Sequence, residues 1–234
     1  MKKIIELLKA DLLVIIRRPA NMFFAVIMVL GVLFLTGFVL NTGTTADIVA
    51  SYAVFISAYT GFIMTSMAIL KDRDRGLYRM YRSSKLSKAE YVSSKISYTA
   101  LSLILSGLII AIGFFTSKIF LSWLILPVII LTVLAHVGMG LLISAFVETT
   151  QEAQRIVQVL FFAMIFLSPV FYTSEGLPQI MQMLQQFIPL THGVEAMRTV
   201  MVDGNGLEHT WRQLTVLIGL TIGTMTVGYR KLEF

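Results

Sequence analysis

Three groups of ionisable residues in this sequence have the residue types that acid–base or metal chemistry requires: Asp72 with Asp74, Glu148 with Glu152, and His192 with Glu195 and His209. Such groups form catalytic or zinc sites at ligand spacings like that of H-E-x-x-H. The two aspartates lie among arginines without metal-ligand companions, the two glutamates fit the exposed face of a short cytoplasmic turn, and His192 with Glu195 and His209 does not form a convincing site. We therefore expect no catalytic residue, no metal site and no enzyme.

Two further chemistries are missing from the chain. It contains no cysteine, which excludes disulfides and thiol catalysis. It also lacks the G-x-x-x-x-G-K loop that cradles nucleotide phosphates, and no Gly-Lys pair occurs in it. We expect the chain to bind no cofactor, and any energy from ATP must come through another protein.

The composition indicates that the chain lies in a lipid bilayer rather than in water. The 234 residues are 56% hydrophobic and only 14% charged, and the mean hydropathy is +0.81. A single soluble core cannot bury that much apolar surface. The sequence predicts an all-α integral membrane protein with one transmembrane domain over residues 1–234.

Apolar segments long enough to cross a bilayer define the predicted topology. A hydrocarbon core of about 30 Å needs about 20 helical residues. Six segments approach this length: 22–40, 48–70, 96–116, 121–146, 156–172 and 214–229. The sequence therefore predicts six transmembrane helices, the third and fourth joined as a hairpin.

The distribution of basic residues predicts the orientation. With six spans, all but Lys118, Arg198 and Arg212 of the 19 Lys and Arg residues lie on one side. Cytoplasmic loops carry such an excess. Both termini are therefore expected in the cytoplasm and the spans in the plasma membrane. The net charge of +6 is explained by these cytoplasmic basic residues, so we expect no nucleic-acid partner.

Residues 1–19 are charged on one helical face and apolar on the other, with Ile4, Leu8 and Leu12 among the apolar residues. This pattern favours a helix that lies in the cytoplasmic interface rather than a cleaved signal peptide. Pro19 would end that helix before the first span.

The loop over residues 71–95 is the most charged part of the chain. Within it Leu77, Met80 and Tyr81 recur at spacings of three and four, which predicts a short amphipathic helix. Such a helix can dock on a cytoplasmic partner. The alternative is a solvated loop whose charge only sets the topology.

The segment over residues 173–212 is half polar and lies between the last two spans, on the predicted outer side. Gly176, Pro178 and Pro189 divide it into short pieces. Glu195 and Arg198 lie one helical turn apart and can pair. A re-entrant helical pair that caps a pathway fits this pattern, and a surface hairpin that joins two spans is the alternative.

These motifs together resemble the ABC-2 type transporter permeases. The stretch "DRDRGLYRMYRSSKLSKAEYVSSK" resembles the family's loop between spans two and three, and "LSPVFY", "EGLPQIMQMLQQFIPLTHGVEAMR" and the closing "DG" resemble its outer segment. With "RRP" after the N-terminal helix, the resemblance covers nearly the whole chain. The sequence departs from the family at His192, where an aromatic is more frequent, and at Ile188, where Asn is common.

The resemblance implies partners and site residues. It implies a cytoplasmic ABC ATPase subunit that binds ATP and Mg, and a dimer with a second copy or a related permease. The implied ATPase-coupling loop contains Arg73, Asp74, Arg75, Gly76, Leu77, Met80 and Tyr81. The implied extracellular gate contains Ser168, Pro169, Gly176, Pro178, Pro189, His192, Glu195 and Arg198.

Within the spans, His136 is the titratable candidate, and Gln154 and Gln158 lie one turn apart; each either lines a pathway or serves packing. The lining expected from Met64 and Met164 favours export of a hydrophobic or amphipathic compound: a drug, an antimicrobial peptide or a lipid. Export of a lipid-linked cell-surface glycan is the alternative within the family. An ion-coupled carrier or a membrane sensor is the alternative outside it.

Overall fold

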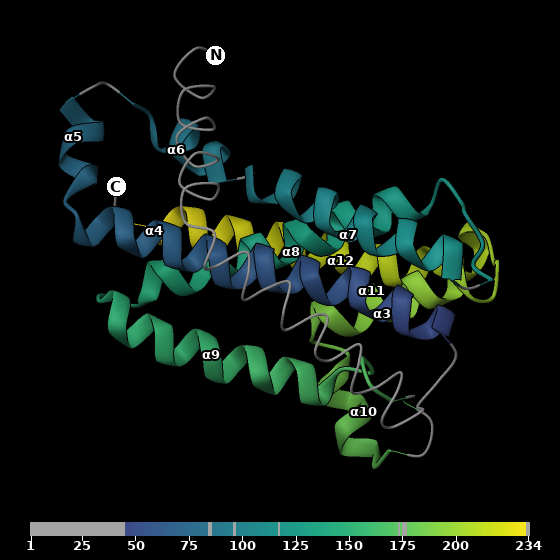
Figure 1. The fold of residues 1–234 in the computed structure, drawn as a ribbon. Helices are drawn as coiled ribbons and strands as arrows, with labels where there is room; N and C mark the ends of the chain where they lie inside the picture. Colours follow the sequence, from purple (N-terminus) through teal and green to yellow (C-terminus); the bar gives the residue numbers. More distant parts are fainter. Residues whose placement is uncertain are drawn as a thin grey trace.

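The computed structural model describes residues 45–232, except 84–85, 96, 117, 173 and 175–176. All regular structure in these residues is helical (Figure 1), which confirms the all-α prediction for this part of the chain. The predicted interfacial helix over 1–19, the first span over 22–40 and Gly176 lie outside the described residues.

The second predicted span is one long helical rod in three parts. An α-helix, α3 (Thr45–Ala58), passes into a π-helix, η2 (Tyr59–Met64), and then into α4 (Thr65–Asp74). The apolar rod extends four residues beyond the predicted end at residue 70, to Asp74. The charged start of the coupling loop is thus helical and continuous with the membrane span.

The next three helices follow the predicted loop. A short helix, α5 (Leu77–Ser83), confirms the predicted helix in the charged loop, and α6 (Lys88–Lys95) and α7 (Ser97–Thr116) follow it. A reciprocal cap begins α6: the Ser87 backbone N–H donates to Glu90 Oε2 at 2.9 Å, and the Glu90 N–H donates to Ser87 Oγ at 3.1 Å. The cap fixes the direction in which the chain enters α6.

The C-terminal half contains α8 (Ile125–Phe146), α9 (Thr150–Leu167), α10 (Gln179–Gln185), α11 (Pro189–Met201) and α12 (Leu207–Lys231). The fifth predicted span began at residue 156, whereas α9 begins six residues earlier. Thr149 is the reason, because its side chain accepts a hydrogen bond from the Glu152 N–H at 3.2 Å and caps a polar first turn.

Three helices in the described residues are long and apolar enough to cross a membrane: Ala46–Asp74, Lys88–Phe115 and Ile125–Phe146. The helices of the fifth and sixth predicted spans, α9 and α12, carry more polar residues. The six-span count therefore stays a prediction. The helices α10 and α11 begin at the breaks that Pro178 and Pro189 predicted. That these two helices re-enter the membrane stays a prediction.

The α8 helix is the centre of the bundle, in contact with α3, η2, α4, α7, α9, α11 and α12. Glycines allow two of these approaches: a Cβ on Gly61 would lie 2.9 Å from His136 Cβ, and one on Gly228 would lie 2.9 Å from Leu142 N. Small residues at helix contacts are typical of membrane bundles, since backbones can then approach closely. The packed centre holds the two ends of the bundle in fixed relation.

Candidate functional site

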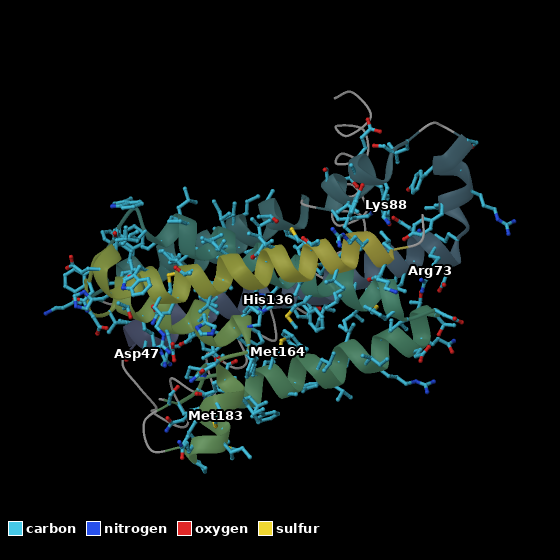
Figure 2. All side chains as sticks on the ribbon, turned by 180° about the vertical axis from the view of Figure 1, so that it is seen from behind. Asp47, Arg73, Lys88, His136, Met164 and Met183 are labelled. Atoms are coloured by element: carbon cyan, nitrogen blue, oxygen red, sulfur yellow. The ribbon has the colours of Figure 1, made fainter. Side chains whose placement is uncertain are left out.

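Polar and charged side chains gather at the two ends of the bundle. Arg73 and Lys88 lie near one end, and Asp47 and Met183 lie near the other, with His136 between them (Figure 2). We call the first the α5 end and the second the α10 end, after the short helix at each. The predicted coupling residues lie at the α5 end and the predicted gate residues at the α10 end.

Gly76 forms the turn between α4 and α5. Its φ is +67°, in the left-handed region, and its N–H donates to the Arg73 carbonyl at 2.8 Å. Glycine is the usual residue at this position after a helix, because a Cβ is strained there. The turn directs α5 away from the axis of α4.

The α5 helix has an inner and an outer face. On the inner face the rings of Tyr78 and Tyr81 pack against Tyr91 of α6, with centroids 5.4 and 5.6 Å apart. Burial raises the pKa of Tyr78 to about 12. Met80 on the outer face is 55% exposed, with Leu77 half-buried. Of the three predicted apolar residues, Met80 is thus the one most open to a partner.

A buried ion pair lies beneath these tyrosines. Lys95 Nζ lies 2.8 Å from Asp72 Oδ2, and the Tyr91 hydroxyl donates to the same oxygen at 3.0 Å. The Lys95 side chain is only 3% exposed. The pair connects α4 to α6, next to the inner face of α5.

A second contact ties α4 to the turn between α8 and α9. The Arg73 guanidinium donates to the carbonyl oxygens of Ser144 and Val147 at the C-terminal end of α8. Cations at this end of a helix offset its dipole and satisfy its free carbonyls. Asp74, Arg75 and Gly76 are exposed, so of the charged coupling residues Arg73 is the one that is held inside the bundle.

Residues 168–191 connect α9, α10 and α11 at the α10 end. Ser168 is buried, and its Oγ accepts a hydrogen bond from Thr191 Oγ1 at 3.1 Å. Gln185 of α10 donates to the Leu167 carbonyl at 2.6 Å. Pro169 is buried, Pro178 precedes α10 and is exposed, and Pro189 is the first residue of α11. The structure thus places Ser168, Pro169, Pro178 and Pro189 at the α10 end, and that they form a gate stays a prediction.

Arg198 of α11 connects three parts of the α10 end. Its Nε lies 3.8 Å from Asp47 Oδ1 of α3, and its guanidinium donates to the carbonyls of Tyr172 and Val170 at 3.2 and 3.4 Å. Burial lowers its pKa, against the opposing effect of Asp47 and Glu195. Among the described residues Arg198 forms its ion pair with Asp47, and no such pair joins it to Glu195 as the helical spacing suggested.

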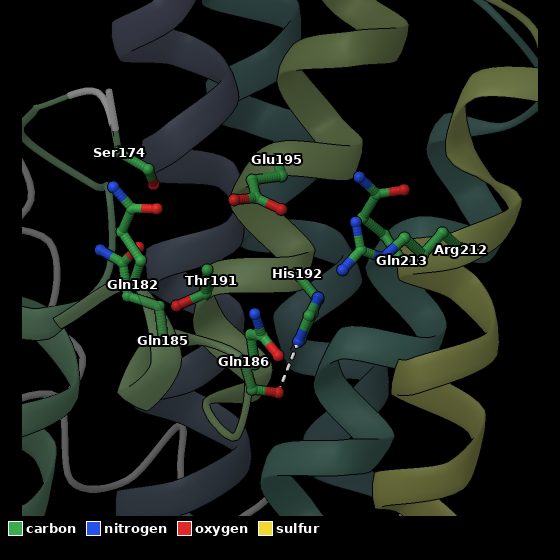
Figure 3. Close-up of a pocket in the computed structure, with 9 residues that line it drawn as sticks. All are labelled: Ser174, Gln182, Gln185, Gln186, Thr191, His192, Glu195, Arg212 and Gln213. Atoms are coloured by element: carbon green, nitrogen blue, oxygen red, sulfur yellow. Dashed lines mark hydrogen bonds between the residues drawn. The ribbon is translucent and has the colours of Figure 1, made fainter. Parts of the chain in front are cut away.

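Glu195 lies instead in a polar pocket of about 170 Å³ between α10, α11 and α12 (Figure 3). Its lining is polar throughout: Ser174, Gln182, Gln185, Gln186, Thr191, His192, Glu195, Arg212 and Gln213. His192 is buried, and its Nε2 donates to the Gln186 carbonyl at 2.9 Å. No sequence pattern groups these residues, because the pocket requires α12 to pack beside α11.

The predicted pathway residues do not lie together. His136 is fully buried, and its Nδ1 donates to the Thr132 carbonyl at 2.7 Å. Gln154 and Gln158 are exposed on α9. On the same helix Phe161 packs against Phe55 and Tyr59, while Phe166 is exposed.

Replacing Arg198 with glutamine is expected to lower the free energy of unfolding by about 2 kcal/mol, because Asp47 and two carbonyls lose a charged donor. Thermal unfolding in detergent would measure this. Arg198→Lys should restore part of it, since the charge remains without the fork of donors. Arg155→Gln, at an exposed position of α9, is the matched control. Equal melting temperatures for Arg198→Gln and Arg155→Gln would contradict the role of Arg198.

The described residues form an all-helical bundle that contains three helices long and apolar enough to cross a membrane. The family description "ABC-2 type transporter" matches residues 2–202. The chain belongs to this family, whose members are the transmembrane subunits of ABC transporters and work with a separate ATPase.

Two curated relatives share the name "Probable multidrug ABC transporter permease YbhR", from Escherichia coli strain K12 and from Escherichia coli O157:H7. Each is 25% identical to this chain over 186 residues, which is 78% of this chain and 50% of the relative. The chain therefore spans about half the length of these relatives.

Proposed function

We propose that this chain is the permease subunit of an ATP-driven exporter in the plasma membrane, with both termini in the cytoplasm. The observation that carries the proposal is α5, a helix set off by Gly76 and anchored on Tyr91, with Met80 exposed. Such a helix presents an apolar side chain to a cytoplasmic ATPase. The basic residues Arg230 and Lys231 at the end of α12 fall at the same end of the bundle, in accord with the positive-inside rule (Figure 1).

The contacts beneath α5 support a mechanism of coupling. A displacement of α5 would be transmitted to α6 through the packed tyrosines. The Asp72–Lys95 ion pair connects α6 to α4, and Arg73 connects α4 to α8. Because α4 is continuous with η2 and α3, the same rod ends beside Arg198 at the α10 end. ATP binding at one end can thus move the gate at the other as rigid elements shift.

For the substrate we propose a hydrophobic or amphipathic compound, such as a drug, an antimicrobial peptide or a lipid. Phe161, an aromatic that a sugar pathway could use for stacking, packs instead against Phe55 and Tyr59. The relatives' name mentions multidrug transport, which is in accord with this substrate class. The transport pathway would form between two permeases, either two copies or this chain and a related one.

Affinity capture of the permease from its native membranes, with mass spectrometry and an ATPase assay, tests the proposal. We expect an ATPase with a phosphate-binding loop at about a one-to-one ratio. Met80→Asp should remove most of the ATPase, because a charge replaces the exposed apolar side chain of α5.

Met183→Asp is the matched control, because Met183 is 58% exposed on α10, at the opposite end. This variant should retain the ATPase. Equal loss of ATPase in both variants would contradict α5 as the docking helix. Capture of the permease without any ATPase, after crosslinking in the membrane, would instead favour a carrier or a sensor.

A further inference from the structure

The polar pocket at the α10 end contains charged groups that are not paired with each other. Glu195 on α11 and Arg212 on α12 both line it, and neither forms an ion pair with any described residue. Figure 3 shows Glu195 and Arg212 on different helices that line the pocket. His192 lies between Gln186 and Arg212. A site with a separate acid and base suits a ligand that carries both charges.

Three of the hydrogen-bond acceptors that line the same pocket lie on α11 and α12. The amide oxygen of Gln213 is buried and has no hydrogen-bond partner among the described residues. His192 Nε2 must carry its hydrogen, because it faces a carbonyl oxygen, which leaves Nδ1 as the acceptor of the neutral ring. The Glu195 carboxylate is the third. A primary ammonium offers three N–H donors and is the chemical group that matches them.

Arg212 supplies the complementary charge. A guanidinium binds phosphate oxygens through paired N–H donors. The pocket of about 170 Å³ exceeds the roughly 150 Å³ that holds a benzene-sized molecule. It can therefore hold an ammonium and a phosphate joined by a short linker.

The surface next to the pocket is apolar, and tryptophans lie at the same end of the bundle. Ile180, Met183 and Leu184 of α10 are exposed, and so is Phe187 immediately after it. Both tryptophans of the chain, Trp123 before α8 and Trp211 on α12, are exposed at this end. Tryptophan is enriched where a bilayer meets water. Such an interface would place lipid headgroups level with the pocket.

We propose that this pocket binds the headgroup of a phosphatidylethanolamine-type lipid, with its ammonium at Glu195, Gln213 and His192, its phosphate at Arg212, and its acyl chains along the exposed face of α10. The lipid holds α10 against the membrane and bridges α11 to α12. The inference does not rest on ATPase docking or on transport, so its test needs neither.

Native mass spectrometry of the purified permease with short-chain phosphatidylethanolamine and with the matched phosphatidylcholine tests the proposal. We expect the ethanolamine lipid to bind about tenfold more tightly, because choline has no N–H donor for the three acceptors. Glu195→Gln should reduce this preference to about twofold or less, and Arg212→Gln should weaken both lipids by a similar factor.

Glu148→Gln and Arg155→Gln make the same charge changes at exposed positions of the α8–α9 region and should leave binding unchanged. Equal binding of the two lipids by the unmodified permease would overturn the proposal, and so would an undiminished preference in Glu195→Gln. Free phosphoethanolamine should bind far more weakly than the lipid. If it binds as tightly, the ligand is a soluble zwitterion and the assignment of α10 to acyl chains is wrong.

Discussion

Replacing Asp72 with asparagine is expected to lower the free energy of unfolding by about 3 kcal/mol, because the buried Lys95 ammonium loses its charge partner. The lysine ammonium then stays at 3% exposure without that carboxylate, which is unfavourable. Thermal or denaturant unfolding of the purified permease would measure the change. Transport should fall as well, since α4 and α6 are no longer held together beneath α5.

The companion variants separate the ion pair from simple packing. Lys95→Met should cost less than Asp72→Asn, because Asp72 keeps the Tyr91 hydroxyl as a donor and is more exposed. The double variant Asp72→Asn with Lys95→Met should recover part of the loss, because no uncompensated charge is left inside. Exposed ion pairs typically contribute less than about 1 kcal/mol. A loss of stability no larger than this in Asp72→Asn would contradict the stabilising role of the buried pair.

Gly76→Pro is expected to reduce transport by at least about tenfold while the permease still inserts into the membrane. Proline fixes φ near −65°, whereas Gly76 has a φ of +67° and uses its N–H to close the turn on Arg73. The turn must therefore rearrange, and α5 loses its direction relative to α4. ATP hydrolysis by the captured complex should persist without a matching rate of transport.

A series at the same position tests whether backbone geometry is the cause. Gly76→Ala meets no atom within 4 Å, so its effect comes from the left-handed backbone, which costs about 1–2 kcal/mol. It should give an intermediate loss of transport. Gly219→Ala in α12 also meets open space, at a glycine without positive φ, and should transport normally. Full transport by Gly76→Pro would exclude the turn from coupling.

Several parts of the fold were predictable because their causes are local. The apolar segment 96–116 predicted a helix observed at Ser97–Thr116, and Pro178 and Pro189 correctly predicted the starts of α10 and α11. Leu77, Met80 and Tyr81 correctly predicted α5. The π-helix within the long rod was not predicted, since its hydrogen bonds leave no mark in an apolar pattern.

The partners within the sites were the part that sequence reasoning missed. Helical spacing suggested Glu195 as the partner of Arg198, but the ion pair is with Asp47, which is far away along the chain. The sequence offered Asp72 as an acid–base or metal-binding candidate without companions, and its pairing with Lys95 depends on how α6 returns to α4. The polar pocket likewise depends on α12. None of these contacts has a fixed sequence separation that a pattern could reveal.

The sequence by itself determined the membrane class, the absence of a nucleotide loop, the family and most helices, because apolar length, helical periodicity and local motifs act over a few neighbouring residues. The tertiary structure decided which face of α5 is exposed, which carboxylate neutralises each buried cation, and that Glu195 faces a pocket with Arg212. These are properties of helices packed around α8, and the energy of a buried charge depends on the partner that packing brings to it.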